Sequence, residues 1–128
     1  MIATKSVEEY VIQLRRYFHE HPEISMKEFQ TMEKVKSELE EMNIPYEVVT
    51  DGGIIGTIEG RAPGKTIMLR ADLDALPVQE SKTNLKQAKK CVSKFDRVAH
   101  TCGHDAHMAM LLGAAKILQN IRDQFSGK

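Results

Sequence analysis

The first third of the chain has a helical period of apolar and polar residues. Apolar spacings of three and four predict a helix over about residues 7–20, with a buried stripe of Val7, Tyr10, Val11, Leu14 and Phe18. A capping-box pattern, Ser6 to Glu9, marks its start, and a second one, Ser25 to Glu28, opens another helix. The stripe of that helix consists of Phe29, Met32, Val35, Leu39 and Met42. Two amphipathic helices this close together need a partner surface.

The next part of the chain changes to a strand pattern. Two β-branched and aromatic runs, 46–50 and 54–59, flank an Asp-Gly-Gly turn and predict a hairpin. Residues 66–69 form a continuous apolar run that suits a strand covered on both faces. This strand would deliver Asp72 and Asp74 beyond its carboxyl end, where functional residues gather in open α/β sheets.

The remaining segments predict a surface loop followed by a helix. Residues 80–99 are rich in lysine without a sustained period, which predicts a mobile surface loop with Cys91 as a bystander thiol. A basic loop could also meet an anionic substrate, but a solvated lysine run is the simpler interpretation. The final helix, about 106–125, is apolar nearly all round through Ala115, so we expect deep packing.

The composition limits the kinds of protein that this chain can be. The 128 residues suit one domain, and 18 basic residues balance 18 acidic ones, which gives no reason to expect a nucleic-acid or membrane partner. No apolar run approaches the roughly 20 residues of a membrane span, and the start lacks a signal-peptide core, so we expect a cytoplasmic protein. Cys91 and Cys102 do not make a disulfide framework and should be free thiols.

Metal-binding atoms are concentrated in residues 102–107, Cys-Gly-His-Asp-Ala-His, where a polar loop gives way to the last helix. In an extended segment residues two apart point the same way, so Cys102 and His104 could reach one ion or two adjacent ions. Gly103 leaves room for a tight turn. A position just ahead of a helix N-terminus favours a thiolate at Cys102, the form that binds metal.

The same residues also admit a structural interpretation. A buried Cys behaves as a small hydrophobic residue, and an Asp at a helix start, such as Asp105, is often only a cap. The C-x-H spacing lacks the paired arrangement of a closed zinc finger. His107 fits a helix face better than a ligand position, and the spacing leaves its role open.

Three sequence blocks occur in order along the chain: 15–23 (RRYFHEHPE, with Glu28 and Thr31), 70–80 (RADLDALPVQE) and 100–107 (HTCGHDAH). Together they resemble the metal-dependent N-acyl-amino-acid amidohydrolases. This family is a branch of the aminoacylase and carboxypeptidase-G-like metallopeptidases that includes hippurate hydrolases and auxin-conjugate hydrolases. The resemblance implies an α/β/α metallopeptidase sandwich, of which residues 1–128 form the N-terminal portion of the metal-binding catalytic domain, without the lid domain.

The resemblance also implies roles for the matching residues. Cys102 and His104 match metal ligands. Asp72 takes the place of a ligand His in the wider superfamily and is expected just outside the ligand set, while Asp74 orients or supports the centre. The implied cofactors are divalent ions, two per complete site, with zinc, manganese and cobalt all suited to such donors.

Four further residues match family positions without being expected to bind metal. Asp105 and His107 are expected to support the metal ligands without binding the metal themselves. His19 and Glu23 match the first block, and we interpret them as structural residues at a helix end.

The function implied is hydrolysis of the amide bond of N-acyl amino acids or small peptides by metal-activated water. The partner would be a small-molecule substrate, with a homo-oligomer left open. Family members carry a general-base Glu and further His ligands beyond the matching segment, whereas this sequence ends at Lys128. Its Glu8-Glu9 and Glu40-Glu41 pairs fall on exposed helix faces and are not that motif. We therefore expect the chain to supply only part of the site.

Two other functions remain open from the sequence. One is a catalytically inactive fragment or metal-binding module that keeps the ligands and lacks the base. The other is a thiol-based redox protein using Cys91 and Cys102, which no C-x-x-C spacing supports. If the rest of a sheet is absent, the run 66–69 and the last helix should expose apolar surface and cause association.

Overall fold

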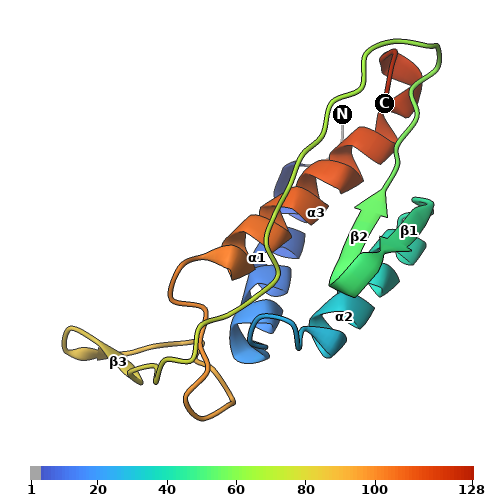
Figure 1. Cartoon of the computed structure of the whole chain (residues 1–128). Helices are drawn as coiled ribbons and strands as arrows, with labels where there is room; N and C mark the ends of the chain where they lie inside the picture. The colour runs from blue at the N-terminus through green and yellow to red at the C-terminus, as the bar shows by residue number, and fades with distance from the viewer. Residues whose placement is uncertain (1–3) are drawn as a thin grey trace.

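The computed structural model describes residues 4–128, which form three α-helices and two small antiparallel sheets (Figure 1). The helices are α1 (Thr4–Glu20), α2 (Phe29–Glu41) and α3 (His104–Asn120). The strands pair as β1 (Tyr46–Val49) with β2 (Gly53–Gly56), and as β3 (Thr83–Asn84) with β4 (Gln87–Ala88). Single 3-10 turns occupy Thr50–Gly52 and Arg122–Gln124. No helix in this described part is long and apolar enough to cross a membrane.

The core lies where α1 and α3 pack side by side, with α2 and the β1–β2 hairpin completing it (Figure 1). Its buried residues are Leu14, Phe18, Leu39, Ile44, Met108, Ala109 and Leu112. At Gly113 the two helices approach so closely that an added Cβ would lie 2.5 Å from Val11 Cγ2. The amphipathic stripe predicted for the first helix therefore faces the last helix, as a buried apolar face requires.

The helix starts differ from the capping-box predictions. The first helix already begins at Thr4, so Ser6 lies inside it and does not precede it. For α2 the residue before the helix makes no side-chain cap, and Glu23 supplies the acceptors instead. Its carboxylate accepts the N–H groups of Gln30 and Thr31 at 3.1 and 2.8 Å. Glu23 is thus a helix-end residue, but it serves the start of α2 and replaces Ser25 in that role.

The predicted hairpin is confirmed. Strands β1 and β2 are antiparallel, and Tyr46 pairs with Gly56 while Val49 pairs with Gly53. The turn between them is the 3-10 segment Thr50–Gly52, in which Gly52 has a φ of 110° that favours glycine. The second strand ends at Gly56, three residues before the predicted end at Glu59.

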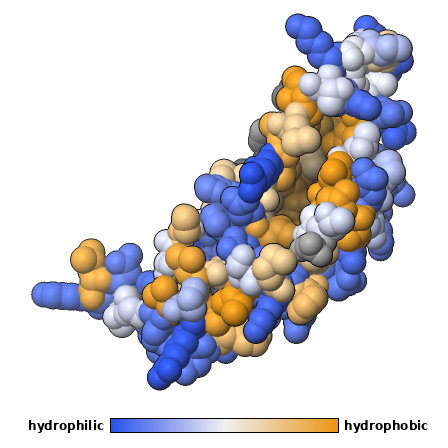
Figure 2. All heavy atoms as spheres, in the orientation of Figure 1, coloured by the Kyte–Doolittle hydropathy of each residue, from blue (hydrophilic) through white to orange (hydrophobic). Residues whose placement is uncertain are grey.

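The apolar run 66–69 is not a strand, so its prediction as a buried strand is wrong. Within residues 4–128 no strand lies beside it, and only the end of the chain reaches it, where the Ile67 N–H donates to the Lys128 carbonyl at 2.8 Å. Met68 is consequently 81% exposed. Figure 2 shows apolar side chains around a hollow between α3 and the β1–β2 hairpin. The expected exposure of apolar surface is therefore present.

The last helix is packed on one side only. It runs over His104–Asn120, and Met108, Ala109 and Leu112 on one face are buried. Met110 and Ile117 lie outside that buried face and are 54% and 40% exposed. Deep packing all round, as expected from its composition, is wrong for this structure because α1 covers a single face.

The lysine-rich segment 80–99 lies mostly on the surface, as predicted, and hydrogen bonds anchor it to the rest of the structure. Backbone hydrogen bonds join Leu76 and Ala99 in both directions, at 3.1 and 3.0 Å. The Lys94 N–H donates to the Glu20 carbonyl at 3.0 Å. Between these anchors the chain forms the β3–β4 hairpin. Cys91 lies against Glu20, and burial together with that carboxylate raises the pKa of its thiol.

Candidate metal centre

A sharp turn places Cys102 directly ahead of α3. Gly103 has φ 104° and ψ 12°, a left-handed conformation, and an added Cβ there would meet nothing within 4 Å. Glycine is thus required for backbone conformation and not for space. The carbonyl of Gly103 accepts the N–H groups of Ala106 and His107 at 3.0 and 3.1 Å, which starts the helix at His104. The expectation that residues 102–104 are extended is wrong, because the helix already begins at the second donor.

His104 is held by Asp74. Its Nδ1 lies 2.9 Å from the Asp74 backbone oxygen and 3.1 Å from Asp74 Oδ1. Both partners are acceptors, so Nδ1 carries a proton, and the neutral form of the ring then has its lone pair on Nε2. Among the described residues Nε2 has no hydrogen-bond partner. An imidazole anchored through one nitrogen and open at the other is the form in which His binds metals.

The other candidate residues surround this pair less closely. Cys102 is an exposed free thiol, and Asp72 forms an exposed ion pair with Arg70. The ring of His107 lies 6.1 Å from that of His104, centroid to centroid, on the exposed side of α3. Within residues 4–128 no three His, Cys, Asp or Glu side chains converge to hold a metal ion.

Asp105 is neither a cap nor exposed. Its side chain is 1% exposed, and Oδ2 lies 2.7 Å from His19 Nδ1 and 3.0 Å from Arg15 Nε. The N-cap position of α3 is Gly103, which has no side chain, and the Asp105 carboxylate is bound to α1 instead of to the helix start. The residue after His104 therefore fastens the turn to the first helix.

His19 forms a bridge that the sequence did not indicate. Its Nε2 lies 2.9 Å from Glu80 Oε1, while its Nδ1 faces Asp105. Burial raises the pKa of Glu80, but hydrogen bonds from the Ser93 N–H, Lys89 and His19 outweigh burial and lower it to about 2. His19 is thus more than a helix-end residue. Its partners are 86 and 61 positions away, so no local pattern could reveal them.

His100 is a buried imidazole without a partner. It is 6% exposed, and neither ring nitrogen has a hydrogen bond in the part of the chain that the structure describes. Burial lowers its pKa, which the nearby Asp105 carboxylate opposes. A buried polar group left unsatisfied costs about 1–3 kcal/mol. The block 100–107 thus carries a polar group that its surroundings do not satisfy.

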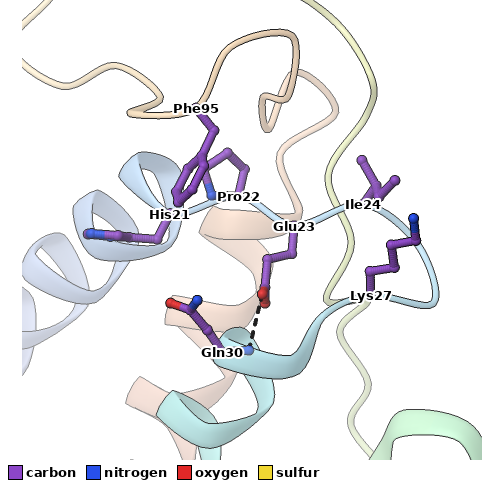
Figure 3. Close-up of a pocket in the computed structure, with 7 residues that line it drawn as sticks. All are labelled: His21, Pro22, Glu23, Ile24, Lys27, Gln30 and Phe95. Atoms are coloured by element: carbon purple, nitrogen blue, oxygen red, sulfur yellow. Dashed lines mark hydrogen bonds between the residues drawn. The ribbon is translucent and has the colours of Figure 1, made fainter.

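A cavity of about 190 Å³ lies on another part of the surface, at the joint between α1 and α2 (Figure 3). Its lining consists of His21, Pro22, Glu23, Ile24, Lys27, Gln30 and Phe95. The Glu23 carboxylate in its wall accepts the Gln30 N–H, as the dashed line shows, and is therefore occupied (Figure 3). None of the residues 102–107 lines this cavity.

The donor chemistry fits a divalent metal ion in part. A thiol and an imidazole two positions apart suit a divalent transition-metal ion, and the Asp74 contact to His104 is the kind that orients a metal-bound imidazole. Catalytic zinc takes three protein ligands and a water, so Cys102 and His104 would provide at most two of the three.

The model of peptidase family M20/M25/M40 matches residues 68–128. Thermostable carboxypeptidase 2 of Saccharolobus solfataricus is 45% identical over 126 residues, which is 97% of this chain and 31% of that protein. N-acetylcysteine deacetylase of Bacillus subtilis is 42% identical over 128 residues, 98% of the chain and 32% of that protein. The chain therefore spans about a third of the length of these curated relatives.

The fold is matched by a solved structure as well. The Bacillus subtilis YXEP protein, described as a dinuclear metal binding peptidase of the M20 family, superimposes with a TM-score of 0.87 at 42% identity. The match covers 98% of this chain and 34% of that structure. The predicted fold class, the aminoacylase-like metallopeptidase type, is confirmed by this similarity. Residues 68–128 belong to peptidase family M20/M25/M40, and the similarity to the relatives above extends over nearly the whole chain.

Proposed function

We propose that residues 1–128 form one part of the metal-binding domain of a hydrolase that cleaves the amide bond of N-acyl amino acids or small peptides. The observation that carries the proposal is His104, whose Nδ1 is anchored by Asp74 and whose Nε2 has no hydrogen-bond partner among the described residues, two positions after Cys102. Relatives named as a carboxypeptidase and an N-acetylcysteine deacetylase support this class of substrate.

Each residue near the turn receives a role in this proposal. In this proposal Cys102 and His104 hold the metal, and Asp74 orients the His104 ring through Nδ1 and leaves Nε2 facing the ion. Asp72, which pairs with Arg70, and His107, whose ring lies 6.1 Å from that of His104, are assigned supporting roles outside the ligand set. A bound divalent ion would supply Lewis-acid chemistry, by making a water acidic and polarising the amide carbonyl.

The proposed cofactor is a pair of divalent ions, zinc, manganese or cobalt. The solved relative described as dinuclear supports two ions. The second candidate function is a metal-binding module without catalysis, and one observation favours it. In the described part of the chain no third donor converges on the pair.

A panel of N-acetyl and N-benzoyl amino acids tests the proposal. The chain is depleted of metal, resupplied with zinc, manganese or cobalt, and assayed for release of the free amino acid, alongside a full-length relative carrying the same substitutions. In that relative, replacing the residue equivalent to Cys102 by Ser should reduce metal content and turnover at least about tenfold. Unchanged turnover would exclude Cys102 as a ligand.

A matched cysteine provides the control. Cys91 lies against α1 at Glu20 and not at the turn, so Cys91→Ser should leave metal uptake unchanged. Metal uptake by the chain without hydrolysis, lost in Cys102→Ser and retained in Cys91→Ser, would favour the metal-binding module over the hydrolase for these residues alone.

A further inference from the structure

We propose that His19 is a positioning residue for the Cys102–His104 donor pair, acting through Asp105 from the opposite side of α3's first turn. The inference rests on the proposed function, since it concerns the same donors. It goes beyond it by assigning a role to a residue of α1 that touches neither donor.

The bridge made by His19 is buried at all three of its members. The side chains of His19, Asp105 and Glu80 are 6%, 1% and 7% exposed. The ring nitrogens lie 2.7 Å from Asp105 Oδ2 and 2.9 Å from Glu80 Oε1. Losing one partner of such a buried contact destabilises the folded chain, because the remaining charge is left uncompensated away from water.

Polar and charged groups hold the His19 ring at both of its nitrogens. Nδ1 lies 2.7 Å from Asp105 Oδ2 and 3.2 Å from Arg15 Nη2, and Nε2 lies 2.9 Å from Glu80 Oε1. Arg15 also pairs with Asp105, and Lys89 pairs with Glu80. Each of the two buried carboxylates therefore has a cationic partner in addition to its contact with His19.

His19 connects the two chain segments that carry the candidate site. One segment runs from Asp74 to Glu80 and the other from Ala99 to Asp105, and the backbone pairing of Leu76 with Ala99 holds them together. His19 binds the far end of both segments from α1. Because Asp105 directly follows His104, fixing Asp105 fixes the first turn of α3 and with it the direction of the His104 ring.

A second histidine at the same end of α1 serves as a matched control. His21 Nδ1 lies 2.8 Å from the Tyr17 carbonyl of its own helix, and its ring stacks on Tyr17 at 4.5 Å. It makes no bond to either segment among the described residues. A residue that matters only for the helix end should thus behave like His21.

The test compares His19→Gln with His21→Gln in cobalt titrations of the chain. Cobalt bound to a thiolate gives a charge-transfer absorption band, which reports on the Cys102 ligand directly and needs no catalysis. We expect His19→Gln to weaken cobalt binding about 10- to 100-fold and to change the shape of the band, as loss of an outer-shell partner does. His21→Gln should alter the affinity by less than about twofold. Wild-type affinity and spectrum in a folded His19→Gln protein would overturn the proposal.

Amide hydrogen exchange separates this inference from the proposed function. If the wild-type chain gives no thiolate band, the metal site fails, and the Ala106 and His107 N–H groups bonded to Gly103 become the readout. Exchange at these two positions should then rise at least about tenfold in His19→Gln and not in His21→Gln. Equal exchange in both variants would refute positioning by His19.

A second variant covers the case in which His19→Gln does not fold. Glu80→Gln keeps the Asp105 partner of His19 and removes the charge on the other side. It should weaken cobalt binding severalfold or speed the exchange of Ala106 and His107. A folded Glu80→Gln protein with neither change would also overturn the proposal.

Discussion

Val11 and Gly113 mark the closest contact between α1 and α3, where an added Cβ on Gly113 would lie 2.5 Å from Val11 Cγ2. Gly113→Ala should therefore force the helices apart. Overpacking costs about 1–3 kcal/mol, while the better helix propensity of Ala returns about 1 kcal/mol. We expect the free energy of unfolding in urea to fall by up to about 2 kcal/mol.

Removing the methyl groups of Val11 tests whether the clash causes the loss of stability in Gly113→Ala. In the double variant Val11→Ala with Gly113→Ala the two changes should be less destabilising together than the sum of the single variants. Strictly additive effects, or a Gly113→Ala protein more stable than wild type, would contradict this account of the helix contact.

Asp74 should matter for metal affinity through His104 alone. Asp74→Asn keeps the backbone oxygen at 2.9 Å from Nδ1 but removes the carboxylate charge at 3.1 Å. We expect affinity for zinc or cobalt to fall roughly tenfold, measured by competition with a chelating dye. Asp123→Asn, an exposed carboxylate beyond α3, is the control and should bind metal like wild type. Loss of affinity in both variants would indicate a general charge effect.

Glu80 should make stability depend on acid pH. Its pKa is about 2 in the folded chain, below the usual 4.5, so the folded state favours the ionised form. This contribution, up to about 3 kcal/mol, is fully present above about pH 5 and is lost as the pH falls from there toward 2. Glu80→Gln should accordingly be much less stable than wild type at pH 7, and this difference should shrink at pH 3.

Urea unfolding at the two pH values measures the difference. Glu47, an exposed carboxylate on β1, supplies the control, since Glu47→Gln should change stability little at either pH. A gap between wild type and Glu80→Gln that stays constant from pH 7 to pH 3 would be inconsistent with the hydrogen bonds assigned to Glu80.

The exposed apolar run 66–69 should cause molecules of this chain to associate with one another. Ile67 and Met68 are 75% and 81% exposed next to one another, and contiguous apolar surface of this kind promotes contact between molecules. Met68→Lys should reduce the apparent mass in concentrated samples, measured by sedimentation. Leu85 is 95% exposed but isolated in the β3–β4 hairpin, so Leu85→Lys should have a much smaller effect. A wild-type chain that remains monomeric at all concentrations would contradict this.

Local patterns predicted the helices and the first hairpin because their signals depend on neighbouring residues. The stripe ending at Phe18 and the Asp-Gly-Gly turn are visible in any short window. The run 66–69 carries an equally clear strand signal, but a strand also needs a partner strand, which no local pattern reports.

The candidate site was predictable in its composition and not in its support. Cys102 and His104 stand together in the sequence, whereas the contact of His104 with Asp74 spans 30 positions. The role of Glu23 at the start of α2 was missed because a capping box at Ser25 looked sufficient. Which carboxylate caps a helix depends on the path of the connecting turn, and that path is a tertiary property.

The bridge at His19 also has a consequence for how the chain folds. The helices and the β1–β2 hairpin involve near neighbours and can form within microseconds. The contacts of His19 close loops of 86 and 61 residues, whose entropic cost must be met before either hydrogen bond forms. The turn around Gly103 therefore gains its final shape at the end of folding, when the first and last helices have already docked.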